Sequence, residues 1–194
     1  MRTILSLAFL FTACFTCFAQ PEKNLAEKLG YDRNAKLLIV HADDMGLSQA
    51  TNSAVIEAFQ KRGISSGSIM VPCPWFPEIA EFAKDNSHFD IGLHLTLTSE
   101  WNKYFFGGVS AAASIPNLLN SKGYFYPSVE EFAKHANSAE VEKEIRAQIE
   151  RALAFGIKPT HLDNHMGTIL VSPEYYQILL KIGHEYKLPV LIPA

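Results

Sequence analysis

Segments with the pattern of β-strands alternate with segments with the pattern of α-helices along most of this chain. Strands are predicted over residues 36–42, 66–71, 90–98, 160–165 and 188–192, and helices over 48–62, 77–84, 141–155 and 172–186. This alternation is typical of a parallel sheet with helical crossovers, either doubly wound or closed into a barrel. The chain is therefore predicted to be an α/β protein.

Local signals define the ends of the predicted helices. Ser48 and Ser172 are candidate N-caps, and a proline opens the helices at 77 and 173. In the segment 141–155, an apolar stripe faces inward and Glu144 is expected to face solvent; the stripe is Val141, Ile145, Ile149 and Leu153.

Residues 99–127 are rich in glycine, serine and aromatic residues and show no clean periodicity. We predict a long ordered excursion, because loops of this length are usually functional or mobile. Its aromatic residues either form a platform for a sugar ring or anchor the loop to the body of the protein; they are Trp101, Tyr104, Phe105 and Phe106.

The first 19 residues have the pattern of a secretory signal peptide, with an apolar core and a small-residue exit at Ala19. A second interpretation takes residues 11–14 as a lipoprotein-type cleavage site that would leave Cys14 lipidated. Residues 20–35 are predicted to be a polar linker with one helical turn, and 36–194 the folded domain. We therefore expect an exported protein, periplasmic or extracellular; on the second interpretation it is also anchored to the membrane through a lipid.

Composition excludes several classes of protein. Apolar residues make up 48% of the chain and charged residues 19%, which is typical of an ordinary globular domain. The net charge of −3 and the lack of a basic run give no basis for nucleic-acid binding. Apart from the leader, which is too short to be a true span, we predict no membrane-spanning segment. Cys73 is the only cysteine beyond the leader, so no intramolecular disulfide is expected.

Side chains that bind metals or transfer protons fall at the carboxyl ends of the predicted strands. Asp43 and Asp44 follow the first strand, His94 lies in the third, and His165 ends the fourth. One carboxylate and two imidazoles suit a divalent metal with open coordination positions, and a second carboxylate can serve as general base. This pattern favours hydrolysis of an amide or ester by activated water. The alternatives are an ordinary turn at the two acids and a solvent-facing histidine at 94.

Further polar residues accompany this set. If residues 160–165 are extended, His161 and Asp163 share a face with His165. Asp163 is then a candidate to orient one of these two histidines. Glu100 and Trp101 are candidates for substrate contact, and His41 is expected to pack at its strand end.

The segments HADDMGLS, IGLHLTLTSEW and PTHLDNH resemble the ChbG/HpnK (YdjC-like) carbohydrate deacetylases, whose counterparts read roughly NADDFGLS, IGLHLNLT and PTHLDSHHH. The resemblance implies a distorted (β/α) barrel of the NodB-like deacetylase type that removes N-acetyl groups from amino sugars or short oligosaccharides. It also implies Asp43 as catalytic base and one Mg²⁺ or Zn²⁺ held by Asp44, His94 and His165. A small carbohydrate substrate and a homodimer follow from the same resemblance.

The sequence departs from the family pattern at three places. Met166 stands where the family has a histidine-rich tail, and Leu191 stands near the place of a usual arginine. In the family, chain beyond the position of Ala194 supplies a histidine in a His-Pro-Gly context as general acid. We count about five strands, too few to close an eight-stranded barrel, so the barrel is expected to be incomplete at its C-terminus. His161 and His184 are the remaining candidates for the acid.

Two other functions are compatible with these patterns. One is a different metal-dependent hydrolase on a similar barrel, a phosphoesterase or an amidase, and two metals per chain would favour the phosphoesterase. The other is a non-catalytic sugar-binding fragment.

Overall fold

The structure is a computed structural model that describes residues 22–192. The chain divides between Leu38 and Ile39 into two units. The first contains α1 (Leu25–Lys28), where the Asn24 side chain accepts the N–H of Glu27 and the Glu27 carboxylate accepts the N–H of Asn24. This capping box stabilises the one helical turn predicted in the linker. The predicted leader and Cys14 lie outside the described residues.

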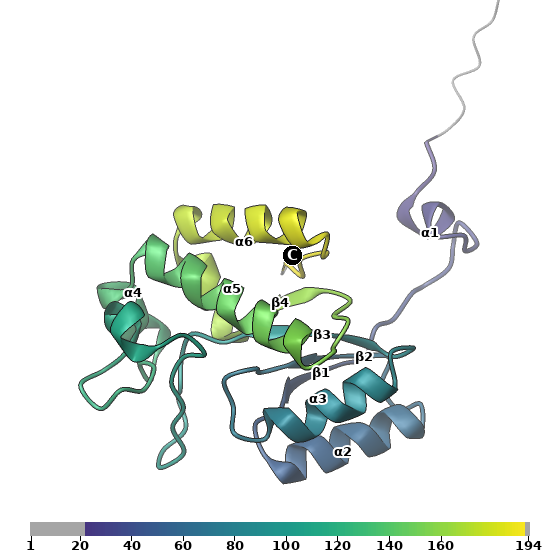
Figure 1. Ribbon diagram of the computed structural model, residues 1–194. Coiled ribbons are helices and arrows are strands. Elements are labelled where there is room, and N and C mark those ends of the chain that lie inside the picture. Colours follow the sequence, from purple (N-terminus) through teal and green to yellow (C-terminus); the bar gives the residue numbers. More distant parts are fainter. Residues whose placement is uncertain (1–21, 193–194) are drawn as a thin grey trace, which may run out of the picture. The chain divides into compact units, whose positions relative to one another are not determined.

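The second unit is built on four parallel strands in the order β1-β2-β3-β4 (Figure 1). The strands are β1 (His41–Met45), β2 (Ser66–Ile69), β3 (Asp90–Leu95) and β4 (Leu162–Asn164). α2 (Gln49–Gln60) connects β1 to β2, α3 (Phe76–Asp85) connects β2 to β3, α5 (Ser138–Ala154) precedes β4, and α6 (Pro173–Tyr186) follows it. The predicted α/β class and parallel sheet are confirmed. In place of the last predicted strand, Val190 forms a single bridge with Leu162.

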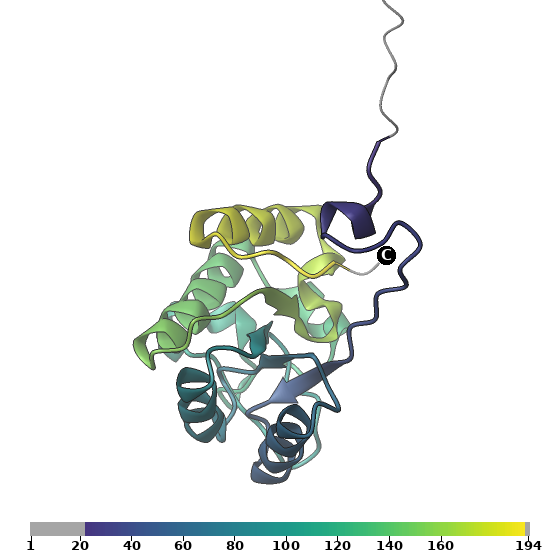
Figure 2. The same ribbon diagram turned by 90° about the vertical axis from the view of Figure 1, so that its right-hand side faces the viewer.

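Two helices, α2 and α6, begin at the serine caps that the sequence indicates, whereas α5 begins at Ser138, three residues before its predicted start. The hydroxyl of Ser48 accepts the N–H of Thr51, and that of Ser172 accepts the N–H of Glu174. In Figure 1 and Figure 2, α2 and α3 lie side by side, and α5 and α6 pack against each other. Apolar side chains of the strands and helices form the core; the fully buried ones include Met45, Ile69, Ile79, Leu93, Ile145, Ile149, Leu162 and Leu179.

The start of β1 differs from the prediction. The strand begins at His41, and residues 37–40, predicted as its buried part, are exposed. The carbonyl of Val40 accepts the N–H groups of Ser65 and Ser66, where β2 starts. The pairing of β1 with β2 therefore begins at Val40 and does not include the apolar residues before it.

The segment between β3 and α5 is ordered by buried apolar side chains. It contains the short helices η1 (Ala112–Ser114) and η2 (Pro116–Leu118), and it also contains α4 (Val129–His135), which the sequence did not predict. Ile115, Leu118 and Phe125 are buried and fix the segment to the core. The expected excursion is therefore an integral part of the fold.

The inward face of α5 is partly polar, contrary to the prediction. Glu144 is fully buried, whereas Leu153 of the predicted stripe is 41% exposed. The Glu144 carboxylate accepts the N–H groups of Val109 and Ser110 at 2.8 and 2.9 Å, and the side-chain amide of Gln148 at 3.0 Å. The backbone donors of the long segment therefore require an acceptor at this position of the helix.

Within residues 22–192, no helix combines the length and the apolar character that crossing a bilayer requires.

Candidate active site

The two adjacent acids of β1 lie at a β-bulge. Between Ala42 and Met45, β1 holds one residue more than the paired stretch of β2, and Asp44 has a left-handed φ of 60°. Side chains of consecutive residues normally point to opposite faces of a sheet. The extra residue re-aims the strand, so Asp43 and Asp44 line the same cavity.

Asp44 faces two histidine rings that come from distant parts of the chain. Its Oδ1 atom lies 3.4 Å from Nε2 of His94 on β3 and 3.3 Å from Nδ1 of His165, which follows β4. One ligand atom from each of these residues lies within 4.8 Å of the other two. The Oδ1 atom is buried and has no hydrogen-bond partner among the described residues. A cation at this position would satisfy an acceptor that is otherwise costly to bury.

The ring of His165 is held on two further sides. His165 opens the helix η3 (His165–Val171), in which Met166 and Gly167 also have left-handed φ. Its Nε2 atom lies 2.7 Å from Oε1 of Glu100, and the indole of Trp101 stacks on the ring with a centroid distance of 5.8 Å. The His165 side chain is thereby fixed in a buried, acidic environment.

Electrostatics in this cluster favour the charged forms. Burial alone would lower the pKa of His165, but its contacts with Asp44 and Glu100 outweigh burial and raise the pKa to about 9. Burial would raise the pKa of Asp44, but the contact with His165 and the charge of His94 lower it instead. The carboxylate and the imidazolium therefore neutralise each other when no metal is bound.

Asp163 on β4 fixes the other ring of the set. Its Oδ2 atom lies 2.6 Å from Nδ1 of His94 and accepts the hydroxyl of Ser68 at 3.1 Å. Its Oδ1 atom accepts the N–H of Asn164 at 2.7 Å. Burial would raise the pKa of Asp163, but the contacts with His41 and His94 hold it well below its usual range. Asp163 was predicted to orient His161 or His165, but its close contacts are instead with His94 on β3 and His41 on β1.

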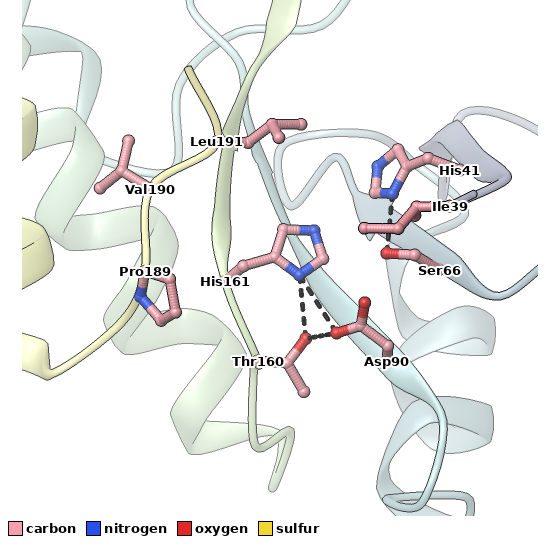
Figure 3. A pocket seen from close by; sticks show the side chains of 9 residues that line it. All are labelled: Ile39, His41, Ser66, Asp90, Thr160, His161, Pro189, Val190 and Leu191. Carbon is pink, nitrogen blue, oxygen red and sulfur yellow. Dashed lines mark hydrogen bonds and ion pairs between the residues drawn. The ribbon is translucent and has the colours of Figure 1, made fainter. Parts of the chain in front are cut away.

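His161 lies away from this cluster. Only residues 162–164 form β4, so the extended segment predicted for 160–165 ends before His165. The His161 ring faces Thr160 and Asp90 near the start of β3 (Figure 3). A Cβ atom at Gly92 would lie 2.5 Å from that ring. Gly92 therefore makes room for the ring of His161.

Two residues of the cluster have roles that sequence reasoning missed. His41 does not simply pack at its strand end: its Nε2 atom lies 3.3 Å from Oδ1 of Asp43 and 3.7 Å from Oδ2 of Asp163. Its position two residues before Asp43 in a strand is a signal that was available, since such residues share a face. Glu100 contacts His165, and no local pattern indicates that pairing.

The cluster opens into a cavity of about 430 Å³, a volume that suits a small ligand. Trp101 lies on its wall. The cavity is lined by Asp43, Asp44, His94, Glu100, Trp101, Asp163, Asn164, His165, Met166 and Leu191.

Fold and site together define an α/β protein with a candidate metal centre at the carboxyl ends of parallel strands. The model of the family described as YdjC-like protein matches residues 37–194. The chain belongs to this family.

Two curated relatives have sequences similar to this chain. The chain is 36% identical over 170 residues to a carbohydrate deacetylase of Thermus thermophilus, an alignment that covers 88% of this chain and 58% of the relative. It is 33% identical over 162 residues to a chitooligosaccharide deacetylase of Yersinia enterocolitica, with 81% and 59% covered. The chain therefore spans less than two thirds of the length of these relatives.

One solved structure has a similar fold. It is a protein of Enterococcus faecalis described as a candidate cellobiose-phosphate cleavage protein, with a TM-score of 0.71 and 29% identity. The alignment covers 78% of this chain and 57% of that protein.

Proposed function

We propose that this protein is a metal-dependent carbohydrate deacetylase that hydrolyses the N-acetyl amide of amino sugars or short oligosaccharides. The convergence of Asp44, His94 and His165 beside Asp43 carries the proposal. Relatives named carbohydrate deacetylase and chitooligosaccharide deacetylase support the choice of substrate class.

Asp44, His94 and His165 are the residues that would hold the ion. Two imidazoles and one carboxylate suit Zn²⁺. The same set binds Mg²⁺ less readily, because Mg²⁺ prefers oxygen ligands. A divalent ion supplies Lewis acidity toward a carbonyl oxygen and acidifies water. Asp163 behind His94 and Glu100 behind His165 hold the two rings in place.

Asp43 is the proposed general base. Its side chain is 61% exposed and lies on the cavity wall next to Asp44. As a carboxylate it takes a proton from the water whose oxygen attacks the acetyl carbonyl carbon. The C–N bond then breaks, acetate is formed, and the leaving nitrogen receives a proton.

The proton for the leaving nitrogen can come from Asp43 itself, which holds one after the attack. The two histidines considered from the sequence are poorly placed for this step. His161 lies near the start of β3, and His184 is exposed on α6. Among residues 22–192, Asp43 is thus the group best placed to act first as base and then as acid.

Acetate release from N-acetylated chito-oligosaccharides, measured with and without a chelator, tests the proposal. We expect release that the chelator abolishes, that added Zn²⁺ or Mg²⁺ restores, and that Asp44→Ala lacks. Asp85→Ala, an exposed acid of α3, is the matched control. Release that is insensitive to chelator, or no release from the wild-type protein, would contradict it.

Export and homodimer formation belong to the proposal as well. Export rests on the leader-like pattern of residues 1–19, and the homodimer rests on the family resemblance alone.

A further inference from the structure

The ring of His41 lies between two carboxylates that serve different parts of the site. Asp43, the proposed base, is on the same strand, and its Oδ1 atom lies 3.3 Å from His41 Nε2. Asp163, which holds His94, comes from β4 at the opposite edge of the sheet. Its Oδ2 atom lies 3.7 Å from the same nitrogen. One nitrogen therefore faces two carboxylates that are otherwise unconnected.

Two serines of β2 keep this ring in place. Nδ1 of His41 lies 2.8 Å from the hydroxyl of Ser66, and Nε2 lies 3.1 Å from the hydroxyl of Ser68. Figure 3 shows the contact with Ser66 and the ring pointing into the cavity at the start of the strands. The side chain is only 17% exposed. Because both nitrogens are engaged, the ring cannot turn away from the carboxylates without losing both contacts.

The charges around the ring favour its protonated form. Asp163 contributes most and Asp43 and Asp90 add to it, so the pKa of His41 is raised although burial opposes this. The neighbouring ring of His161, with a centroid distance of 5.3 Å, has a pKa lowered by burial, so it does not compete for the charge. The three carboxylates thus favour the protonated form of the His41 ring.

We propose that His41 is a positioning residue of the deacetylase site: its protonated ring ties the base Asp43 to Asp163, the carboxylate that orients His94. The inference rests on the proposed function. The Asp43 side chain is largely exposed, and His41 is its only charged contact among residues 22–192. Loss of the ring frees the base and removes one of the groups that fix Asp163.

A titration of the histidine ring signals by NMR tests the charged contact without any need for activity. In the wild-type metal-free protein, we expect the His41 signal to titrate with a midpoint above 6.5. In Asp43→Asn and in Asp163→Asn the midpoint should fall, while the signal of His184, on α6, stays unchanged. A wild-type midpoint at or below 6.5, or one that neither variant moves, would overturn the proposal.

Kinetics test the positioning role. In His41→Phe we expect kcat for acetate release to fall at least tenfold, with KM within twofold of wild type. His41→Asn keeps a neutral amide donor and should recover part of kcat. The ratio of wild-type to His41→Asn kcat should shrink as the pH rises from 6 to 9, because only the wild-type ring loses a proton. His184→Asn is the control.

A purely structural role for His41 predicts a ratio that does not change with pH, and that result would overturn the proposal. A metal analysis that finds two bound ions per chain in the wild type and one in His41→Asn would also overturn the proposal. The His41 ring would then be a metal ligand. If the wild-type protein releases no acetate, the proposed function fails, and the NMR midpoints still decide whether His41 links the two carboxylates.

Discussion

Nδ1 of His94 lies 2.6 Å from Oδ2 of Asp163, while Nε2 on the other side of the same ring faces Oδ1 of Asp44 at 3.4 Å. A carboxylate behind an imidazole fixes its tautomer and its orientation, and it makes the opposite nitrogen a better ligand. Asp163 is buried and further held by Ser68. The ring of His94 is therefore set for its proposed task before any ion binds.

Asp163→Asn should weaken metal binding without preventing folding. The amide keeps the size of the side chain but removes the negative charge, and loss of such an outer partner costs about 10- to 100-fold in metal affinity. Zn²⁺ competition against a chromogenic chelator measures the effect. The exposed Asp85→Asn provides the baseline, and equal affinities in both variants would show that Asp163 does not support the ligand.

Metal affinity should rise with pH because His165 must give up a proton. Its pKa of about 9 in the metal-free protein means that the ring is charged at pH 7. Binding should then release about one proton, and the apparent affinity should increase about tenfold per pH unit until the pH approaches this pKa. Calorimetric titrations in buffers of different ionisation enthalpy count the protons, and binding with no proton release would contradict the assignment.

The raised pKa of His165 also makes the free energy of unfolding of the metal-free protein decrease at high pH. Because His165 binds its proton more tightly in the folded chain, the contribution to the free energy of unfolding is complete below pH 6.5 and is lost as the pH rises through about 9. Thermal unfolding of the chelator-treated protein at several pH values should show this decline.

Because Asp44 has a left-handed conformation, a glycine at this position should give a more stable protein than an alanine, the reverse of the usual order. Asp44→Gly should be more stable than Asp44→Ala by about 1 kcal/mol, since an L side chain is strained at positive φ. Both variants lack the carboxylate, so the comparison isolates the backbone. At Glu81, in the middle of α3, glycine should instead be less stable than alanine by about 1 kcal/mol. Urea unfolding measures both pairs, and the same order at both positions would argue against the bulge.

Glu144→Ala should destabilise the protein by about 2 kcal/mol or more, because it leaves buried backbone donors without an acceptor. The affected N–H groups of Val109 and Ser110 belong to the segment that also carries Glu100 and Trp101. Hydrogen exchange should therefore accelerate along that segment before the strands are affected. Glu81→Ala, on the exposed side of α3, should change the free energy of unfolding by less than about 0.5 kcal/mol; equal effects would contradict the anchoring role.

The sequence indicated the features of the fold that local patterns determine. The alternation of elements gave the parallel sheet, and Ser48 and Ser172 marked the helix starts. Because parallel strands end at one edge, the placement of Asp44, His94 and His165 at strand ends was sufficient to predict that they converge. Their catalytic roles stay predictions.

Features that depend on long-range contacts could not be predicted in this way. The bulge at Asp44 follows from the register between β1 and β2, which no local pattern contains. Glu144 has the spacing of a solvent-facing residue and is buried because a distant loop needs its oxygens. The partner of Asp163 depends on which strands are neighbours, and hydrophobic periodicity does not order strands within a sheet.

The close packing of Gly92 against the ring of His161 links two positions that are 69 residues apart in the chain. Neither position can change alone without a collision or a void: a larger residue at 92 needs a smaller one at 161. Related chains should therefore show correlated substitutions at these two positions, so the residue at 92 should predict the size of the residue at 161.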